Sequence, residues 1–157
     1  YKSMELGYKP DVILSGRNVN DYMPAYIAKK TAQMLIKKGK NPGQSRALVM
    51  GITFKENVSD IRNSKVVELV NELKGYSMTV DVIDPFAAND ELQHEYGLGL
   101  CPEPTGKYDC IVVAVNHRQY ACLDEAYFQQ ITSNDAIFID VKGTFYHKIQ
   151  QLQYWTM

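Results

Sequence analysis

From Arg46 onward, short apolar runs alternate with segments of helical periodicity, and this alternation constrains the fold more than any other feature. The runs that read as strands cover residues 46–52, 78–84, 108–115 and 136–141. The helical segments that follow them cover residues 63–75, 87–97, 123–131 and 144–152. The run YDCIVVAV is the most apolar, as expected of a central strand covered on both faces. Strands alternating with helices favour an α/β fold with a Rossmann-like, doubly wound parallel sheet.

A further helix is expected before the first strand, over residues 20–40, after a polar lead-in with turn signals at YKP and SGRN. Asn20 or Asp21 would cap this helix, and Pro24 is tolerated in a first turn. Its apolar face comprises Met23, Tyr26, Ile27, Met34 and Leu35. Because the helix precedes the sheet, it need not belong to the sheet's layers and could pack against another domain or a second subunit.

The composition excludes several classes of protein. The chain has 157 residues, with 17 Lys and Arg against 18 Asp and Glu, so its net charge gives no electrostatic case for nucleic acid or an anionic membrane. No apolar run approaches the roughly 20 residues of a membrane span. The start, YKSMELGYKP, lacks the features of a signal peptide, and without an initiator methionine it suggests a piece of a longer protein.

Cysteine and histidine do not form an obvious site. The cysteines are odd in number and have no CxxC spacing, which argues against a disulfide framework or a zinc site: Cys101, Cys110 and Cys122. We expect reduced thiols in a cytoplasmic protein. The histidines are scattered and read as surface or satisfied side chains rather than metal ligands: His94, His117 and His147.

The loop after the first expected strand carries charge where a nucleotide-binding loop ordinarily carries glycine. The segment GITFKENVSDIRNS has only Gly51, followed by Phe54, Lys55, Asp60 and Arg62. Ligands of open parallel sheets sit beyond the carboxyl ends of the strands, and two cations at the mouth of a helix suit a pyrophosphate. Long charged side chains can reach beyond their own domain, so we expect a ligand held between this domain and another. Alternatively, Lys55 and Arg62 are solvated and Asp60 is a local ion partner.

Other strand ends offer weaker candidates. Asp84 follows the second strand, about where a Rossmann acid holds a ribose, but GxGxxG is missing and Asp-Pro is also an ordinary turn. Asn116 and Arg118 follow the third strand and could line the same cleft or begin a helix. Lys142 follows the last strand, where solvated lysines are common.

The charged loop also carries a resemblance. GITFKENVSDIRNSKVVELV has a glycine, then Phe-Lys, then Asp-x-Arg-x-Ser, and so resembles the signature of the UDP-glucose/GDP-mannose dehydrogenase family, the nucleotide-sugar dehydrogenases. SGRNVNDYMPAYIAKK resembles the end of that family's central helical region, and DVIDPFA, EYGLGL and FIDVKGTF also fit. ENVSDIRNSKV and DVKG look most like the bacterial branch that oxidises UDP-N-acetylhexosamines for surface polysaccharides.

The resemblance implies an enzyme of three parts. An amino-terminal Rossmann domain binds NAD, a central helical region forms the dimer, and a carboxy-terminal domain binds the UDP-sugar. Residues 1–44 would be the end of the helical dimerisation region, and residues 45–157 the Rossmann-like UDP-sugar-binding domain. The implied reaction is the NAD-dependent oxidation of the C6 alcohol of a UDP-sugar, UDP-N-acetylhexosamine or UDP-glucose, to a uronate through a cysteine-linked thiohemiacetal and thioester. The family's catalytic cysteine stands in a glycine-rich motif that no cysteine here matches, so we expect the chain alone to be inactive.

The resemblance also implies roles for single residues. Phe54 and Lys55 match the family's Phe-Lys pair at the nucleotide-sugar. Arg62 matches the arginine that reaches NAD on the other domain. Lys142 stands where the family has a basic residue that contacts substrate, and Arg17 is a further substrate-binding candidate. The implied partners are a UDP-sugar, the missing NAD-binding domain and a second subunit of a homodimer, with no metal.

Two interpretations from other classes stay open. A flavodoxin-like regulatory module such as a phospho-receiver fits Lys142, but a receiver needs an acidic pair after its first strand, where the sequence has Gly51, Ile52 and Thr53. A purely structural dimerisation and regulatory domain would use residues 20–40 as its interface.

Overall fold

The computed structural model describes residues 11–157, and the side chains from residue 21 onward. Arg17 therefore lies outside the described side chains, and its assignment stays a prediction. The described helices are α2 (Asp11–Lys37), α3 (Lys65–Gly75), α4 (Asn89–Tyr96) and α5 (Glu125–Gln130). The strands are β1 (Arg46–Met50), β2 (Thr79–Ile83), β3 (Tyr108–Val113), β4 (Thr132–Asp140) and β5 (Gln153–Thr156).

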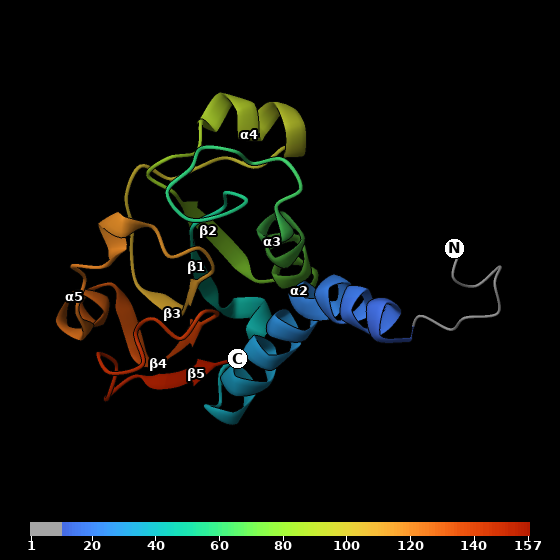
Figure 1. The fold of residues 1–157 in the computed structure, drawn as a ribbon. Helices are drawn as coiled ribbons and strands as arrows, with labels where there is room; N and C mark the ends of the chain where they lie inside the picture. The colour runs from blue at the N-terminus through green and yellow to red at the C-terminus, as the bar shows by residue number, and fades with distance from the viewer. Residues whose placement is uncertain (1–10) are drawn as a thin grey trace, which may run out of the picture.

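Within residues 11–157, the strands form one parallel sheet in the order β2-β1-β3-β4-β5 (Figure 1). Val49 of β1 pairs with Val82 of β2 on one side and with Val112 of β3 on the other. The chain runs outward from β1 to β2 and then crosses back to β3, so the strand order reverses between β1 and β3. The α/β, doubly wound class predicted from the alternation is confirmed, and the reversal marks where such sheets place ligands.

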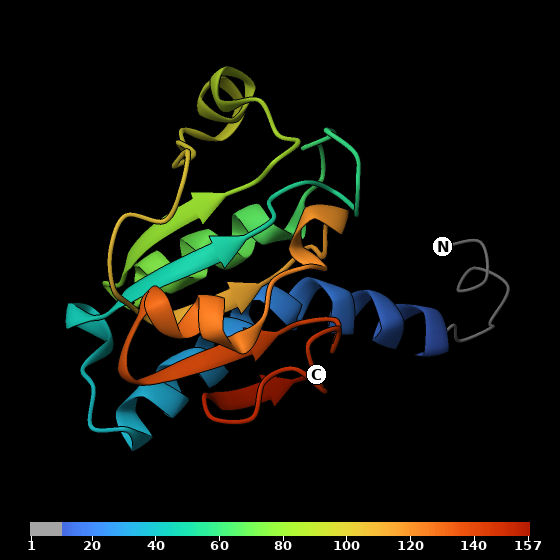
Figure 2. The ribbon, with the colours of Figure 1, turned by 90° about the vertical axis from the view of Figure 1, so that its left-hand side faces the viewer.

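Helices cover both faces of the sheet (Figure 2). Alternate residues of β1 face opposite sides, so Ala47 and Val49 belong to one buried cluster while Leu48 and Met50 belong to the other. The first cluster is closed by α2, α3 and α4 through Leu35, Val70, Leu73 and Leu92. The second is closed by α5 and the turns after β4 through Phe128, Phe145 and Ile149.

The first helix is longer than predicted. α2 begins at Asp11, so neither Asn20 nor Asp21 caps it, the SGRN stretch is helical, and Pro24 lies inside it. A serine or glycine costs a helix only about 1 kcal/mol or less, so the SGRN stretch does not interrupt it. The predicted apolar face is largely correct, although Tyr26 is exposed.

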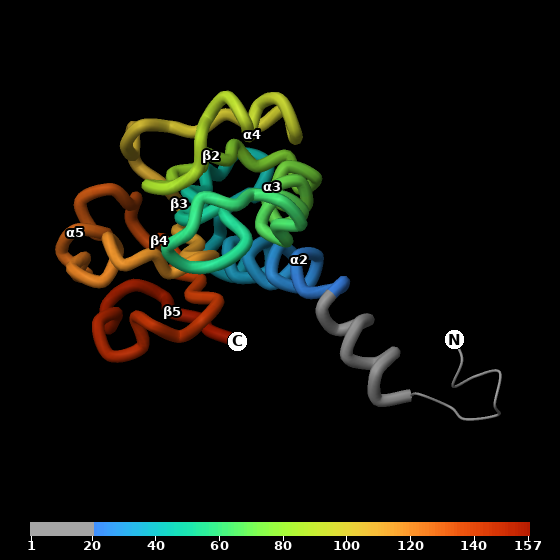
Figure 3. The backbone as a smooth tube through the Cα atoms, turned by 45° about the horizontal axis from the view of Figure 1, so that its top comes forward, coloured from blue at the N-terminus to red at the C-terminus, as the bar shows by residue number. Residues whose placement is uncertain are grey.

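The carboxy-terminal half of α2 packs against α3 and the sheet rather than standing apart from them (Figure 3). Ile27, Ala28 and Leu35 are buried in the same cluster as the strands. Just beyond the helix, the Lys40 ammonium lies 2.8 Å from the Asp109 carboxylate. The division at residue 44 remains a prediction, but the end of α2 shares its core with the sheet.

The helix predicted over residues 144–152 is wrong: turns occupy these residues, and they lead to β5, a strand that the periodicity did not indicate. The carboxylate of Asp140 accepts the N–H groups of Gly143 and Phe145 at 3.1 and 2.7 Å. Glu125 Oε1 accepts three successive N–H groups, from Gln150, Gln151 and Leu152. Glu125 thus satisfies the N–H groups of residues 150–152, which a helix over 144–152 would have paired internally, and Asp140 fixes the start of the turns, which allows the short crossover to β5.

Candidate functional site

A cavity of about 300 Å³ opens beyond the carboxyl ends of β1, β3 and β4, at the reversal in strand order. Its apolar floor includes Ile27 of α2, Leu69 of α3 and Ala114 after β3. Its other lining residues come from α2, the loop after β1, the start of α3 and the strand ends: Met23, Pro24, Thr53, Phe54, Lys55, Glu56, Asn63, Lys65, Val66, Val115, Val141 and Lys142.

Lysines gather around this cavity. Lys55 from the loop after β1 and Lys142 from the turn after β4, nearly 90 residues apart in sequence, both line it with Phe54, as does Lys65 at the start of α3. Lys65 is paired with Glu68 and Asp21 at 3.1 and 3.3 Å, and the hydrogen bond to Glu68 does most to raise its pKa. Within residues 21–157, Lys55 and Lys142 take part in no ion pair.

Arg62 lies outside this cavity, beside a smaller hollow that it forms with Phe54, Asp60 and Asn63. Its guanidinium makes a forked contact with Asp60, with Nε and Nη2 at 3.0 and 3.1 Å from the carboxylate oxygens. Hydrogen bonding with Arg62 lowers the pKa of Asp60, and the same contact raises the pKa of Arg62. The Arg62 side chain is 81 % exposed, so Asp60 orients a guanidinium that faces outward.

The loop between β1 and α3 is closed by its own hydrogen bonds. The N–H of Phe54 donates to the carbonyl of Asp60 at 2.7 Å. The hydroxyl of Ser64 donates to the carbonyl of Ile52 at 2.7 Å, and Ser64 also caps α3. The two ends of the loop are therefore held together, and Phe54, which is 57 % exposed, and Lys55 project from it.

Gly51 is needed at the start of this loop, although the loop is not rich in glycine. Its φ is +90°, and a Cβ there would lie 2.6 Å from both Cβ and O of Val115. Only glycine lets the end of β1 pass this close to the end of β3.

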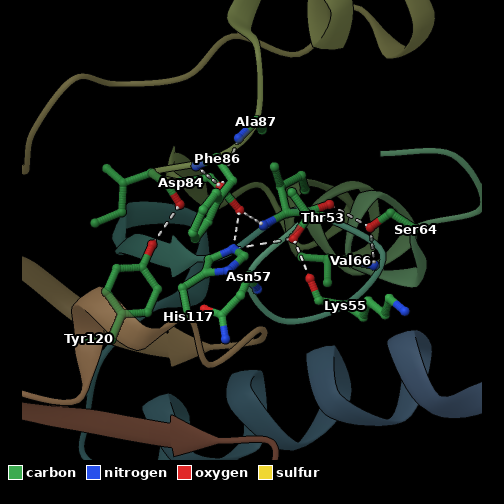
Figure 4. Close-up of polar contacts among 12 residues, drawn as sticks. Thr53, Lys55, Asn57, Ser64, Val66, Asp84, Phe86, Ala87, His117 and Tyr120 are labelled. Atoms are coloured by element: carbon green, nitrogen blue, oxygen red, sulfur yellow. Dashed lines mark hydrogen bonds and ion pairs between the residues drawn. The ribbon is translucent and has the colours of Figure 1, made fainter. Parts of the chain in front are cut away.

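Asp84 does not line the cavity; it is buried beneath the loop (Figure 4). Its carboxylate accepts the N–H groups of Ile52, Phe86 and Ala87 at 2.7, 2.7 and 2.9 Å, and lies 2.8 Å from Nε2 of His117. Burial alone would raise the pKa of Asp84, but the hydrogen bonds from His117 and the three N–H groups outweigh it and lower the pKa.

The other candidates after β3 also lie off the cavity. Arg118 places its guanidinium over the Phe86 ring, 5.3 Å from the ring centre. Asn116 is half-buried, and its Oδ1 has no hydrogen-bond partner among residues 21–157. His117 is buried and hydrogen-bonded, as the interpretation of a satisfied histidine requires. The sequence offered a signal for the contact between Asp84 and His117, because the two residues follow β2 and β3, the strands that flank β1.

The cysteines lie apart from the cavity: none of Cys101, Cys110 and Cys122 lines it. Cys110 is buried in β3, and burial raises the pKa of its thiol. Over the described part of the chain, no cluster of His, Cys, Asp and Glu side chains has the geometry to hold a metal ion. None of the described helices combines the length and apolarity that a membrane crossing requires.

Known proteins are similar to this sequence along most of its length. The family model for the UDP-glucose/GDP-mannose dehydrogenase family, UDP binding domain, matches residues 48–147. The UDP-N-acetyl-D-glucosamine 6-dehydrogenase of Salmonella typhi is 38 % identical over 143 residues, covering 90 % of this chain and 34 % of that protein. Protein CapL of Staphylococcus aureus is 37 % identical over 144 residues, covering 91 % and 34 %. The chain thus spans about a third of the length of these relatives.

Solved structures share the fold. The UDP-D-ManNAc dehydrogenase from Pyrococcus horikoshii aligns with a TM-score of 0.79 at 20 % identity, covering 94 % of this chain and 34 % of that chain. The NDP-N-acetyl-D-galactosaminuronic acid dehydrogenase from Methanosarcina mazei aligns with a TM-score of 0.76 at 23 % identity, covering 91 % and 30 %. The structures support the fold alone, whereas the family match over residues 48–147 argues against a phospho-receiver. The chain belongs to the UDP-glucose/GDP-mannose dehydrogenase family, of which it is the UDP binding domain.

Proposed function

We propose that this chain binds the UDP part of a UDP-sugar, as one domain of an NAD-dependent dehydrogenase that oxidises the sugar C6 alcohol to a uronate. The observation that carries the proposal is the cavity at the strand ends, where Phe54, Lys55 and Lys142 meet. The names of the relatives from Salmonella typhi and Pyrococcus horikoshii support a UDP-N-acetylhexosamine as the substrate class.

The chemistry of the cavity suits a nucleoside diphosphate. Lys55 and Lys142 supply positive charge from two different loops, and neither is paired with a carboxylate within residues 21–157. The amino-terminal end of α3 adds favourable backbone dipoles for phosphate oxygens. The apolar floor suits the flat, weakly polar surface of a base or a ribose, and the exposed Phe54 ring adds a second such surface.

NAD would be held mainly by another domain, with Arg62 as this chain's contribution. The outward guanidinium beside an open hollow fits a phosphate approaching from outside the domain, because arginine offers forked hydrogen bonds to phosphate. NAD supplies the hydride acceptor of the reaction. No residue of this chain is assigned a catalytic role, and we expect the chain alone to be inactive. The resemblance to the bacterial branch further supports a cytoplasmic homodimer acting in polysaccharide biosynthesis.

Calorimetric titration of UDP into the chain tests the site. We expect weak binding, with a Kd of about 0.1–1 mM, because part of the site lies on another domain. ADP serves as the matched control, since it carries the same diphosphate on a different base. Absence of heat with UDP, or equal affinity for ADP, would contradict the proposal. NADH formation from UDP-N-acetylglucosamine by the chain alone would contradict the expected inactivity.

A further inference from the structure

The buried side chain of His117 contacts the loop between β1 and α3. We propose that His117 is a positioning residue for this site. His117 does not line the cavity. Through its contacts with Thr53 and Asn57, it holds residues 53–57 in the conformation that directs Lys55 to the diphosphate of UDP. The inference rests on the proposed function for the identity of the ligand, but the contacts that carry it do not depend on a ligand.

The contacts of the imidazole select one protonation state. The N–H of Asn57 donates to Nδ1 at 3.0 Å, so Nδ1 must present a lone pair. Nε2 lies 2.8 Å from the Asp84 carboxylate, which accepts, so Nε2 carries the proton. Thr53 Oγ1 is 3.2 Å from the same nitrogen and donates its own proton to the carbonyl of Lys55 at 2.9 Å. Neutral His117 with Nε2–H satisfies every one of these contacts.

Burial and hydrogen bonds fix the orientation of the His117 ring, so the ring can hold the loop residues that bind it in place. Both His117 and Asp84 have side chains that are 0 % exposed. The three N–H groups that Asp84 accepts, from Ile52, Phe86 and Ala87, fix the carboxylate to the ends of β1 and β2. The imidazole also packs against aromatic rings, with centres 4.8 Å from Phe86 and 5.7 Å from Tyr120.

Lys55 is tied on both sides to this histidine. Before it, Thr53 contacts Nε2 and binds the Lys55 carbonyl; after it, Asn57 donates to Nδ1. Asn57 has a φ of +63°, a conformation that a residue other than glycine adopts at a cost. A second bond holds it there, because Asn57 Oδ1 accepts the N–H of Arg118 at 2.7 Å. Figure 4 shows Thr53, Lys55 and Asn57 around the imidazole of His117, with the Lys55 side chain directed away from it.

Three variants separate positioning from general stability. His117→Phe keeps an aromatic ring but removes both nitrogens, and we expect about tenfold weaker UDP binding and faster amide exchange at Asn57. His117→Gln retains a hydrogen-bond donor and an acceptor, and we expect affinity within about threefold of wild type. Tyr120→Phe is the matched control, because Tyr120 packs against the same imidazole but makes none of the hydrogen bonds to the loop; its UDP affinity should not change.

The outcomes distinguish this inference from the proposed function. Long-range ¹⁵N–¹H spectra of the unliganded wild type should find the His117 proton on Nε2 and slow exchange at the Asn57 amide. A proton on Nδ1, or fast exchange at Asn57, would overturn the positioning role even if His117→Phe fails to fold. If UDP binds wild type and His117→Phe equally well, positioning is also wrong. If UDP does not bind wild type while both spectroscopic results hold, the proposed function is wrong, but the inference that His117 holds residues 53–57 in place is supported.

Discussion

The hydroxyl of Ser64 donates to the carbonyl of Ile52 at 2.7 Å, which joins the start of α3 to the end of β1. The same oxygen accepts the N–H of Val66 at 3.2 Å and so caps α3. Ser64 is buried, and its two contacts enclose the whole segment that projects Phe54 and Lys55. The Ser64 hydroxyl therefore joins the two ends of this loop, and the bond from the N–H of Phe54 to the carbonyl of Asp60 joins it again further along.

Ser64→Ala should lower the free energy of unfolding by about 1–2 kcal/mol, because it removes a helix cap and leaves the carbonyl of Ile52 without this donor. Urea denaturation measures the loss. Ser64→Thr is the matched control: it keeps the hydroxyl and should lose less. Equal stability of the alanine and threonine variants would show that the hydroxyl contributes nothing.

Lys55→Ala and Lys142→Ala should each weaken UDP binding about tenfold, since each removes a charge that faces the cavity. Lys74→Ala, in the last turn of α3 at the opposite end of that helix, should leave the affinity unchanged. Calorimetry at two salt concentrations adds a second readout, because wild-type affinity should fall with salt more steeply than that of either cavity variant. If Lys74→Ala weakens binding as much as Lys55→Ala does, net charge rather than the cavity explains the effect.

Arg62→Ala should weaken NAD binding more than UDP-sugar binding in a longer chain that carries an NAD-binding domain, because Arg62 faces a hollow separate from the cavity. Asp60→Asn is an informative partner variant: it keeps the size of the side chain but weakens the forked contact that orients the guanidinium. We expect it to weaken NAD binding less than Arg62→Ala does. KM values for both ligands measure the difference, and equal changes for NAD and UDP-sugar would remove the assignment of Arg62.

The sheet was predictable because its signals are local. The first three strands and the second half of β4 are short apolar runs, and α3, α4 and α5 follow such runs at helical periodicity. The segment 144–152 has the same periodicity, with Phe145 and Ile149 buried, yet it forms turns. Its shape depends on the carboxylates of Asp140 and Glu125, and the Glu125 contacts join residues 25 or more apart in sequence. Residue spacing alone cannot indicate such distant acceptors.

The residues that line the cavity were predictable in part for a related reason, while their roles in binding stay predictions. Phe54, Lys55 and Lys142 follow strands whose carboxyl ends meet at one edge of a parallel sheet, so their convergence follows from topology. Asp84 and His117 follow strand ends as well, but they turn beneath the loop rather than toward the cavity. Their direction depends on the hydrogen bonds of Asp84 with the N–H of Ile52 and with His117, which join residues 32 and 33 apart in sequence and form only once the strands are paired.

Asp84 should make folding stability depend on pH in the acid range. Its pKa in the folded protein is lowered below the ordinary value of about 3.9, so its contribution is fully present above that pH and is lost as pH falls through the folded pKa. Asp84→Asn should lower the free energy of unfolding by about 2–3 kcal/mol at pH 7, because an amide cannot replace all of the hydrogen bonds that the buried carboxylate accepts from His117 and three N–H groups. Below about pH 4 the difference from wild type should narrow.

Urea denaturation between pH 7 and pH 2 measures this difference. Asp135→Asn is the control. Asp135 is exposed and takes part in no ion pair among residues 21–157, so the free energy of unfolding of this variant should match that of wild type at every pH. A gap between Asp84→Asn and wild type that stays constant down to pH 2 would mean that the carboxylate charge of Asp84 does not stabilise the fold.

Gly51→Ala should cost far more stability than its backbone conformation alone explains. Gly51 and Gly39 both have positive φ, at +90° and +77°, but a Cβ at Gly39 has nothing within 4 Å, whereas one at Gly51 meets Val115 at 2.6 Å. Gly39→Ala should therefore cost about 1 kcal/mol of backbone strain, and Gly51→Ala about 3 kcal/mol or more. Because the clash pushes apart the ends of β1 and β3, where the cavity opens, Gly51→Ala should also weaken UDP binding while Gly39→Ala leaves it intact. Denaturation and calorimetry on the two variants measure both effects, and equal losses of stability would show that strand separation at Gly51 is not constrained.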